Sequence, residues 1–212
     1  MNKTITVAFT GASGLPYGLR LLECLLAAGC RVHLLCTQAA HIVARQELGE
    51  TWPSRPADLA TFFQARFAVG AEQLQVWGPQ EWFAPMASGS NPGDGMVVCP
   101  CTMGSMASIA AGLSENLLER AADVMLKEGR KLILVPRETP FSVIHLENML
   151  KLARAGAVIL PPNPGFYHHP QSVADLVDFV VARILDQLGV PHALMARWGE
   201  SDAQLAPAFP HE

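Results

Sequence analysis

The chain has 212 residues; half are hydrophobic, 16% are charged, and the formal net charge is −4. This length suits one domain, and so low a charged fraction is typical of a chain that covers surface by self-association. The slight acidic excess, without any basic run, argues against a nucleic-acid or acidic-membrane partner. No apolar run is long enough to span a membrane, and the first residues lack the pattern of a signal peptide. We therefore expect a soluble, cytoplasmic protein.

Short apolar runs separated by helical patterns dominate the chain. The runs are continuous rather than alternating, which is typical of strands buried on both faces. Strands that alternate with helices indicate a parallel, doubly wound α/β sheet with right-handed crossovers. The predicted strands are Ile5–Thr10, Val32–Thr37, Met96–Pro100, Leu132–Pro136 and Ala157–Pro161, with a shorter one at Gln73–Trp77.

Helix start and stop signals lie between these strands. Pro16–Ala28 places leucines at helical spacing before Gly29, and Ser114–Lys127 is amphipathic. Ser142 and Ser172 suit the N-caps of two later helices, and residues around Leu59–Phe67 predict another. We take residues 1–190 as one domain and expect the tail, 191–212, to pack on a neighbouring copy.

The five cysteines are odd in number and lie mostly in apolar patterns, which indicates buried thiols in a reducing compartment. Cys99 and Cys101 lack the two-residue spacer of redox and zinc pairs. His168 and His169 are adjacent, so their side chains point apart, and no third ligand accompanies them. We predict no metal site.

Two turns rich in small residues follow predicted strands. Thr10–Gly14 lets backbone N–H groups and a hydroxyl approach an anion at a helix N-terminus, although the dinucleotide spacing is absent. Cys101–Ser105 opens another helix, and the two turns could flank one crevice that holds a mononucleotide or flavin. A tight turn in the first segment and ordinary N-capping in the second remain open alternatives.

Charged and aromatic residues gather after the last two strands. Arg137, Glu138 and Tyr167 lie on loops at strand carboxyl ends, where ligands bind in open α/β sheets. Arg183 lies in a mostly apolar helix, where an unpaired cation is costly. Several structural alternatives stay open. Arg183 could pair with Asp178 or Asp186, Arg137 with Glu138, and Asp123 with Lys127.

In their order and combination, four segments resemble the flavin prenyltransferase family of the UbiX/Pad type. They are Thr10–Glu23, Val97–Gly104, Asn116–Glu128 and Leu134–Asp178. The resemblance implies a Rossmann/flavodoxin-like three-layer sandwich. It also implies a homo-oligomer, often a dodecamer, with FMN and substrate at subunit interfaces.

The implied reaction transfers a dimethylallyl group from dimethylallyl monophosphate to N5 and C6 of reduced FMN. The prenylated FMN would serve a UbiD-type decarboxylase, with ubiquinone biosynthesis as the usual setting. By matching position, the expected catalytic residues are Glu138, Ser13, Glu47 and Lys127, and the expected substrate ligands are Tyr167, Arg183, Arg120 and Lys127. The expected FMN ligands are Gly11, Ala12, Ser13, Thr37, Thr102, Met103, Gly104, Ser105 and Arg137.

These residue types suit the departure of an allylic phosphate, because preorganised cations and donors stabilise its developing charge. The Asp-rich magnesium motif of diphosphate-using prenyltransferases is absent, so we expect metal-independent catalysis on a monophosphate. Position 37 is Thr where Ser is commoner in the family, which keeps the hydroxyl. The alternatives are an FMN-dependent decarboxylase of cysteine-type or aromatic acids and a non-catalytic FMN carrier. Against the cysteine-type enzymes, the first helix region lacks a His and residues 85–88 read Pro-Met-Ala-Ser.

Overall fold

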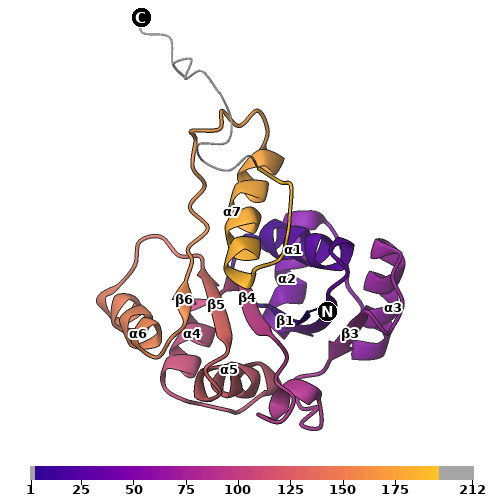
Figure 1. The fold of residues 1–212 in the computed structure, drawn as a ribbon, viewed down its shortest axis with the longest axis vertical. Helices are drawn as coiled ribbons and strands as arrows, with labels where there is room; N and C mark the ends of the chain where they lie inside the picture. Colours follow the sequence, from indigo (N-terminus) through magenta and orange to yellow (C-terminus); the bar gives the residue numbers. More distant parts are fainter. Residues whose placement is uncertain (1–2, 196–212) are drawn as a thin grey trace, which may run out of the picture.

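A six-stranded parallel sheet forms the centre of the computed structural model, which describes residues 3–195 (Figure 1). The strand order is β3-β2-β1-β4-β5-β6, so the chain reverses its direction of travel between β1 and β4. The predicted parallel, doubly wound sheet is confirmed. The strands are β1 (Thr4–Phe9), β2 (Arg31–Cys36), β3 (Leu74–Trp77), β4 (Gly95–Cys101), β5 (Lys131–Pro136) and β6 (Val158–Ile159).

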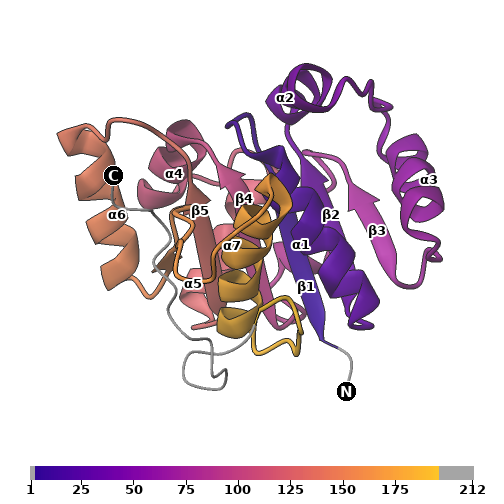
Figure 2. The ribbon, with the colours of Figure 1, turned by 90° about the horizontal axis from the view of Figure 1, so that it is seen from above.

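Helices cover both faces of the sheet and complete the three-layer sandwich (Figures 1 and 2). One face packs against α1 (Leu15–Ala27), α3 (Pro56–Phe67) and α7 (Val173–Leu188). The other packs against α4 (Met103–Ala110), α5 (Leu117–Lys127), α6 (Val143–Arg154) and the 3-10 turn η1 (Pro85–Ala87).

One further helix, α2 (Gln38–Leu48), lies near the carboxyl ends of the strands (Figure 2). The sequence patterns did not assign it. It begins at Thr37, whose hydroxyl accepts a hydrogen bond from the Ala40 N–H at 3.3 Å. Each predicted strand is present, although β6 is shorter than the apolar run that predicted it.

The prediction of buried thiols holds for three cysteines. Cys30, Cys99 and Cys101 are buried, while Cys24 and Cys36 are half-buried, and all five are free thiols. Burial raises the pKa of Cys101 to about 12, so the thiol stays protonated at neutral pH.

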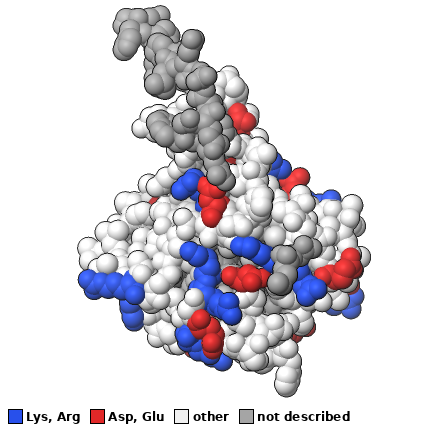
Figure 3. Space-filling view, in the orientation of Figure 1, with Lys and Arg blue, Asp and Glu red and all other residues white. Residues whose placement is uncertain are grey.

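Of the predicted tail, only 191–195 belongs to the described residues. Leu194 packs against the core there, and residues 196–212 lie outside the described part of the chain. Between residues 3 and 195, the structure contains no helix that is both long and apolar enough to cross a membrane. Lys and Arg are interspersed with Asp and Glu on the face shown in Figure 3, which fits the small net charge.

Close packing of α1 on the sheet depends on Gly18. A Cβ at this position would lie 2.4 Å from the Cys99 carbonyl oxygen and 2.7 Å from the Phe9 ring. Backbone and ring both belong to the buried core, so neither can move aside cheaply. The glycine therefore sets how near α1 approaches β1 and β4.

We predict that Gly18→Ala lowers the free energy of unfolding of the flavin-free protein by roughly 1–3 kcal/mol, because the added methyl overpacks the core. Gly104→Ala is the control, since a Cβ there meets nothing within 4 Å in the first turn of α4. Denaturant unfolding of both variants measures the difference. Equal stabilities would show that α1 does not depend on this close approach.

Candidate functional site

The carboxyl ends of β1 and β4 meet at Thr10, at the point where the strand order reverses. The fully buried Thr10 hydroxyl donates a hydrogen bond to the Pro100 carbonyl oxygen at 2.7 Å. It also accepts one from the Thr102 N–H at 2.9 Å. Ligands of open α/β sheets bind in the crevice outside such a switch point. The two small-residue turns predicted to flank one crevice are thus joined by one side chain.

The loop after β1 lies against the start of α2. A Cβ at Gly11 would lie 2.4 Å from the Cβ of Ala39, so only glycine allows this approach. The Thr37 N–H donates to the Phe9 carbonyl oxygen at 3.0 Å, which places Thr37 beside the same loop. Gly11–Ser13 and Thr37 therefore lie together at one edge of the sheet.

Two pairs of backbone N–H groups lie on either side of the Thr10 junction. Ala12 and Ser13 contribute one pair, and Met103 and Gly104 in the first turn of α4 contribute the other. Within the described part of the chain, none of the four has a hydrogen-bond acceptor. Such N–H groups suit an anion or a carbonyl-rich ring edge. This donor set suits a ligand that carries both an anion and a carbonyl-rich ring, such as FMN.

The N-terminus of α1 itself already holds an anion, the Glu47 carboxylate. Glu47 Oε1 accepts from the Gly14 N–H at 3.0 Å, and Oε2 accepts from the Leu15 N–H at 3.0 Å. A carboxylate is favourable at this end of a helix. These two amides are therefore occupied by Glu47, while the preceding amides of Ala12 and Ser13 have no acceptor in the described structure. Anion binding by the Thr10–Gly14 turn stays a prediction.

The start of α4 shows the N-capping that was left open from the sequence. The Thr102 hydroxyl oxygen accepts from the Ser105 N–H at 3.1 Å and donates to Ser105 Oγ at 2.9 Å. Capping fixes both hydroxyls beside the Met103 and Gly104 amides. The capping alternative is confirmed, and it leaves the amides of the first turn available.

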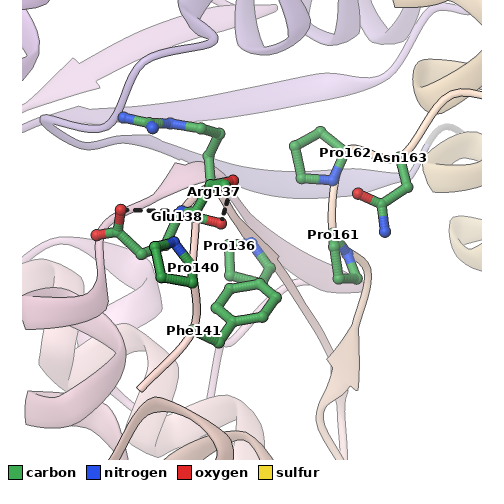
Figure 4. Close-up of a pocket in the computed structure, with 9 residues that line it drawn as sticks. Pro136, Arg137, Glu138, Pro140, Phe141, Pro161, Pro162 and Asn163 are labelled. Carbon is green, nitrogen blue, oxygen red and sulfur yellow. Dashed lines mark hydrogen bonds between the residues drawn. The ribbon is translucent and has the colours of Figure 1, made fainter.

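A pocket of about 310 Å³ opens at the carboxyl ends of β5 and β6 (Figure 4). Its walls come from Pro136–Phe141 on one side and Pro161–Asn163 on the other. Glu138 lies at its rim, and its carboxylate accepts from the Thr139 N–H at 3.0 Å. The pocket therefore combines proline and phenylalanine walls with one acid, Glu138, and with the polar residues Arg137, Thr139 and Asn163.

Arg137 is joined to the end of β4, because its N–H donates to the Cys101 carbonyl oxygen at 3.3 Å. In Figure 4 its side chain points away from the Pro161–Pro162 wall. No ion pair joins Arg137 to Glu138 in the described structure, so the alternative in which they neutralise each other is not observed. Both residues belong to the same edge of the sheet as Thr10 and Thr102.

The cations of α5 lie elsewhere. Arg120 donates to the Ala87 carbonyl oxygen at 3.0 Å and pairs with Asp123 at 2.9 Å, while Lys127 pairs with Glu128. The alternative Asp123–Lys127 pair is therefore wrong.

Lys127 precedes β5 and Glu138 follows it. Six strand residues span about 20 Å, so the two side chains lie near opposite ends of β5. One chain does not bring Lys127 together with the Glu138 pocket.

Tyr167 lies on the segment that precedes α7, and Arg183 lies in α7 itself. The Tyr167 side chain is 74% exposed. Arg183 pairs with Asp186 at 2.7 Å, which confirms one of the two alternatives raised from the sequence. Asp178 instead pairs with Arg20 of α1 at 2.7 Å.

Sequence reasoning missed the structural role of the Thr10 hydroxyl and the apolar walls of the pocket. Phe141 and Pro161–Asn163 form much of these walls. The available signal was the occurrence of two proline-rich loops after neighbouring strands, which a parallel sheet must bring to one edge.

Together these features define an α/β fold with a set of free backbone amides at the switch point and a pocket at the carboxyl ends of β5 and β6. Comparison with known proteins gives the family. The Flavoprotein family model matches residues 1–185. Flavin prenyltransferase UbiX of Pseudomonas aeruginosa is 55% identical over 92% of this chain and 94% of its own length. UbiX of Halalkalibacterium halodurans is 49% identical over 92% of this chain and 93% of its own length.

Solved structures agree. AnUbiX (PadA1) in complex with FMN and dimethylallyl pyrophosphate has a TM-score of 0.81 and 39% identity, covering 95% of this chain and all of that one. A dodecameric FMN-dependent UbiX-like decarboxylase from Escherichia coli O157:H7 has a TM-score of 0.79 and 43% identity, covering 92% of this chain and 98% of that one. The chain belongs to the Flavoprotein family and, within it, to the UbiX flavin prenyltransferases, as its sequence segments predicted.

We predict that Thr10→Val lowers the free energy of unfolding by about 2 kcal/mol, since it leaves the Thr102 N–H and the Pro100 carbonyl without their partner. FMN binding should weaken too, because the two turns separate. Thr10→Ser is the control, since it keeps the hydroxyl and loses only a methyl, roughly 1 kcal/mol or less. Chemical denaturation and flavin titration measure both effects. A valine variant as stable as the serine variant would contradict the bridging role.

Proposed function

We propose that this chain transfers a dimethylallyl group from dimethylallyl monophosphate to reduced FMN. Flavin N5 bonds to C1 of the dimethylallyl group and loses its proton, while the allylic C–O bond breaks and phosphate leaves with the electron pair. A proton then adds to C2 of the prenyl double bond, C3 bonds to flavin C6, and C6 loses its proton. One of the two flavin protons thus ends on C2, and the other passes to the phosphate or to a carboxylate. Reduced FMN supplies the nucleophile, and the protein supplies position and charge.

The single observation that carries this proposal is the Thr10 junction, with unpartnered amides on both sides and the Glu138 pocket beside it. The Ala12 and Ser13 amides, with the Thr37 hydroxyl, hold the FMN phosphate. Met103, Gly104, Ser105, Thr102 and Arg137 hold the ring. Glu138 and Ser13 take part in proton transfer beside the ring. Glu47 holds the loop that contains Ser13 in place.

Cations replace a metal in stabilising the leaving phosphate. Tyr167 and Arg183 bind this phosphate, and Arg120 and Lys127 add positive charge. Among the described residues, no three His, Cys, Asp or Glu side chains cluster as a metal site would require. The AnUbiX structure contains dimethylallyl pyrophosphate. Activity should therefore also be measured with the diphosphate in place of the monophosphate.

The active form is a homo-oligomer in which neighbouring copies complete each site. On α6, Val143, Ile144, Leu146 and Leu150 are each at least half exposed, although the helix is apolar on that side. So large an exposed apolar surface suits an interface with a second copy. The dodecameric relative from Escherichia coli supports the same assembly.

We further infer a cytoplasmic enzyme whose product serves a UbiD-type decarboxylase, with ubiquinone biosynthesis as the setting. A reduced, modified flavin must be handed on before it is oxidised or lost. A partner that consumes it therefore belongs in the same compartment.

The test of the proposed function is mass spectrometry of the flavin after anaerobic incubation with reduced FMN and dimethylallyl monophosphate. We predict a flavin heavier by one five-carbon prenyl unit, formed equally well in EDTA. Glu138→Gln should slow its formation roughly hundredfold or more if the acid transfers a proton. It should leave FMN affinity unchanged.

Other outcomes would contradict the proposal. Unchanged FMN, from protein that is folded and flavin-loaded, would favour the carrier. Release of carbon dioxide from an aromatic acid without a prenyl donor would favour the decarboxylase. Loss of activity in EDTA that Mg²⁺ restores would remove the metal-independent mechanism.

Shared sites make a separate prediction, because Lys127 and Glu138 lie far apart within one chain. Lys127→Ala and Glu138→Gln chains, each nearly inactive alone, should regain activity when they are co-assembled. If one copy supplies Lys127 and its neighbour supplies Glu138, random mixing yields up to about a quarter intact sites. Separately assembled variants, mixed without subunit exchange, are the control. No recovery in verified mixed oligomers would contradict a shared site.

A further inference from the structure

The segment between β6 and α7, here called the Tyr167 arm (residues 160–172), runs alongside α7 and extends beyond the sheet (Figure 1). The start of the arm is joined to β5, because the Leu160 N–H donates to the Leu134 carbonyl oxygen at 2.8 Å, and two hydrogen bonds farther along are local. The His169 N–H donates to the Phe166 carbonyl oxygen at 3.0 Å, and the Gln171 N–H donates to Asp175 Oδ2 at 2.7 Å. Local turns do not by themselves fix where the outer part of the arm lies, and contacts with α7 contribute to its position.

Phe179 of α7 provides these contacts. The His168 ring stacks on the Phe179 ring, with centroids 5.4 Å apart and an interplanar angle of 17°. A Cβ at Gly165 would lie 2.9 Å from two atoms of the same ring, so the arm backbone passes directly against it. Both His168 ring nitrogens are buried without a hydrogen-bond partner in the described structure, so packing holds this imidazole.

The neighbouring residue, Asp178, joins α7 to α1 on a different side of the helix. Its carboxylate forms a bidentate pair with Arg20 of α1, with Oδ1 2.7 Å from Nε and Oδ2 3.1 Å from Nη2. Adjacent helical residues differ by about 100° in direction, so Asp178 faces α1 while Phe179 faces the arm. Bidentate geometry restricts orientation as well as distance.

This ion pair lies where the packing of α7 changes. Val180, Val181, Ile184 and Leu185 are buried in the core, whereas Val173 in the first turn is 76% exposed. Hydrophobic packing therefore holds the second half of α7. The Arg20–Asp178 pair fixes the helix near the arm.

Phe179 also sets the distance between the arm and Arg183. The two residues are four apart in α7, so they lie on the same side of the helix, one turn from each other. An arm held on the Phe179 ring therefore lies on the side of α7 from which Arg183 projects.

We propose that Asp178 and Phe179 form a two-sided clamp that positions the Tyr167 arm over Arg183 and thereby sets affinity for the phosphate of the prenyl donor. Asp178 fastens α7 to α1, the helix that follows the Ser13 loop, and Phe179 holds the arm. Asp178, Phe179 and Arg20 are positioning residues. The effect on affinity rests on the proposed function, in which Tyr167 and Arg183 bind that phosphate.

Charge reversal tests the clamp. Arg20→Asp and Asp178→Arg should each speed hydrogen exchange of the His169 and Gln171 amides roughly tenfold, because the arm end of α7 loosens. Each should raise KM for dimethylallyl monophosphate about fivefold, with kcat and FMN Kd nearly unchanged. The double variant restores an oppositely charged pair and should recover most of both effects.

Two further variants make the result specific. Arg55→Asp is the matched control, since Arg55 and Asp58 form another bidentate pair, at 2.6 and 3.0 Å, far along the chain from the arm. It should change neither exchange nor KM. Gly165→Ala should act like the single reversals, because the methyl collides with the Phe179 ring.

The outcomes separate this inference from the proposed function. Wild-type protein that forms no prenylated flavin would refute the proposed function. The hydrogen-exchange rates of the variants would still test the clamp independently. Unchanged exchange in both single reversals would overturn the clamp. Faster exchange with unchanged KM would overturn its link to phosphate affinity. Failure of the double variant to recover either effect would remove the Arg20–Asp178 pair from the explanation.

Discussion

One buried hydroxyl joins the two halves of this fold where its ligand site lies. Thr10 directly follows β1, and its hydroxyl donates to the Pro100 carbonyl oxygen near the end of β4 and accepts from the Thr102 N–H just beyond that strand. Because β1 and β4 lead into helices on opposite faces of the sheet, the turns that follow them would otherwise diverge. The bridge keeps the two turns, with their free amides, side by side at the carboxyl edge of the sheet. Everything that we assign to flavin binding depends on this distance.

Close contacts and hydrogen bonds arrange the other loops at the carboxyl edge of the sheet around the Thr10 junction. Gly11 allows the start of α2 to pack closely against the loop after β1. Near the end of α2, the Glu47 carboxylate accepts a hydrogen bond from the N-terminus of α1. The Glu47 carboxylate therefore links the far end of α2 to the loop that contains Ser13. Positions that the family resemblance marks as catalytic can thus serve geometry as well as proton transfer.

Much of this architecture follows from local pattern, and the remainder depends on contacts between distant segments. Continuous apolar runs predict buried strands, and caps such as Ser142 and Ser172 predict helix starts, because both depend on neighbours in sequence. The stacking of His168 on Phe179 and the pairing of Arg20 with Asp178 depend on how α1, α7 and the arm meet. No local pattern distinguishes Asp178 from Asp186 as a partner for Arg183. The separation of Lys127 from Glu138 also becomes clear only when the direction of β5 is known.

The most direct test of the central claim is a structure of this protein with FMN bound. The account predicts the phosphate within hydrogen-bond distance of the Ala12 and Ser13 amides, the ring edge against the first turn of α4, and Glu47 still bound to Gly14 and Leu15. A phosphate that displaces Glu47 from the start of α1, or a flavin away from the Thr10 junction, would contradict it.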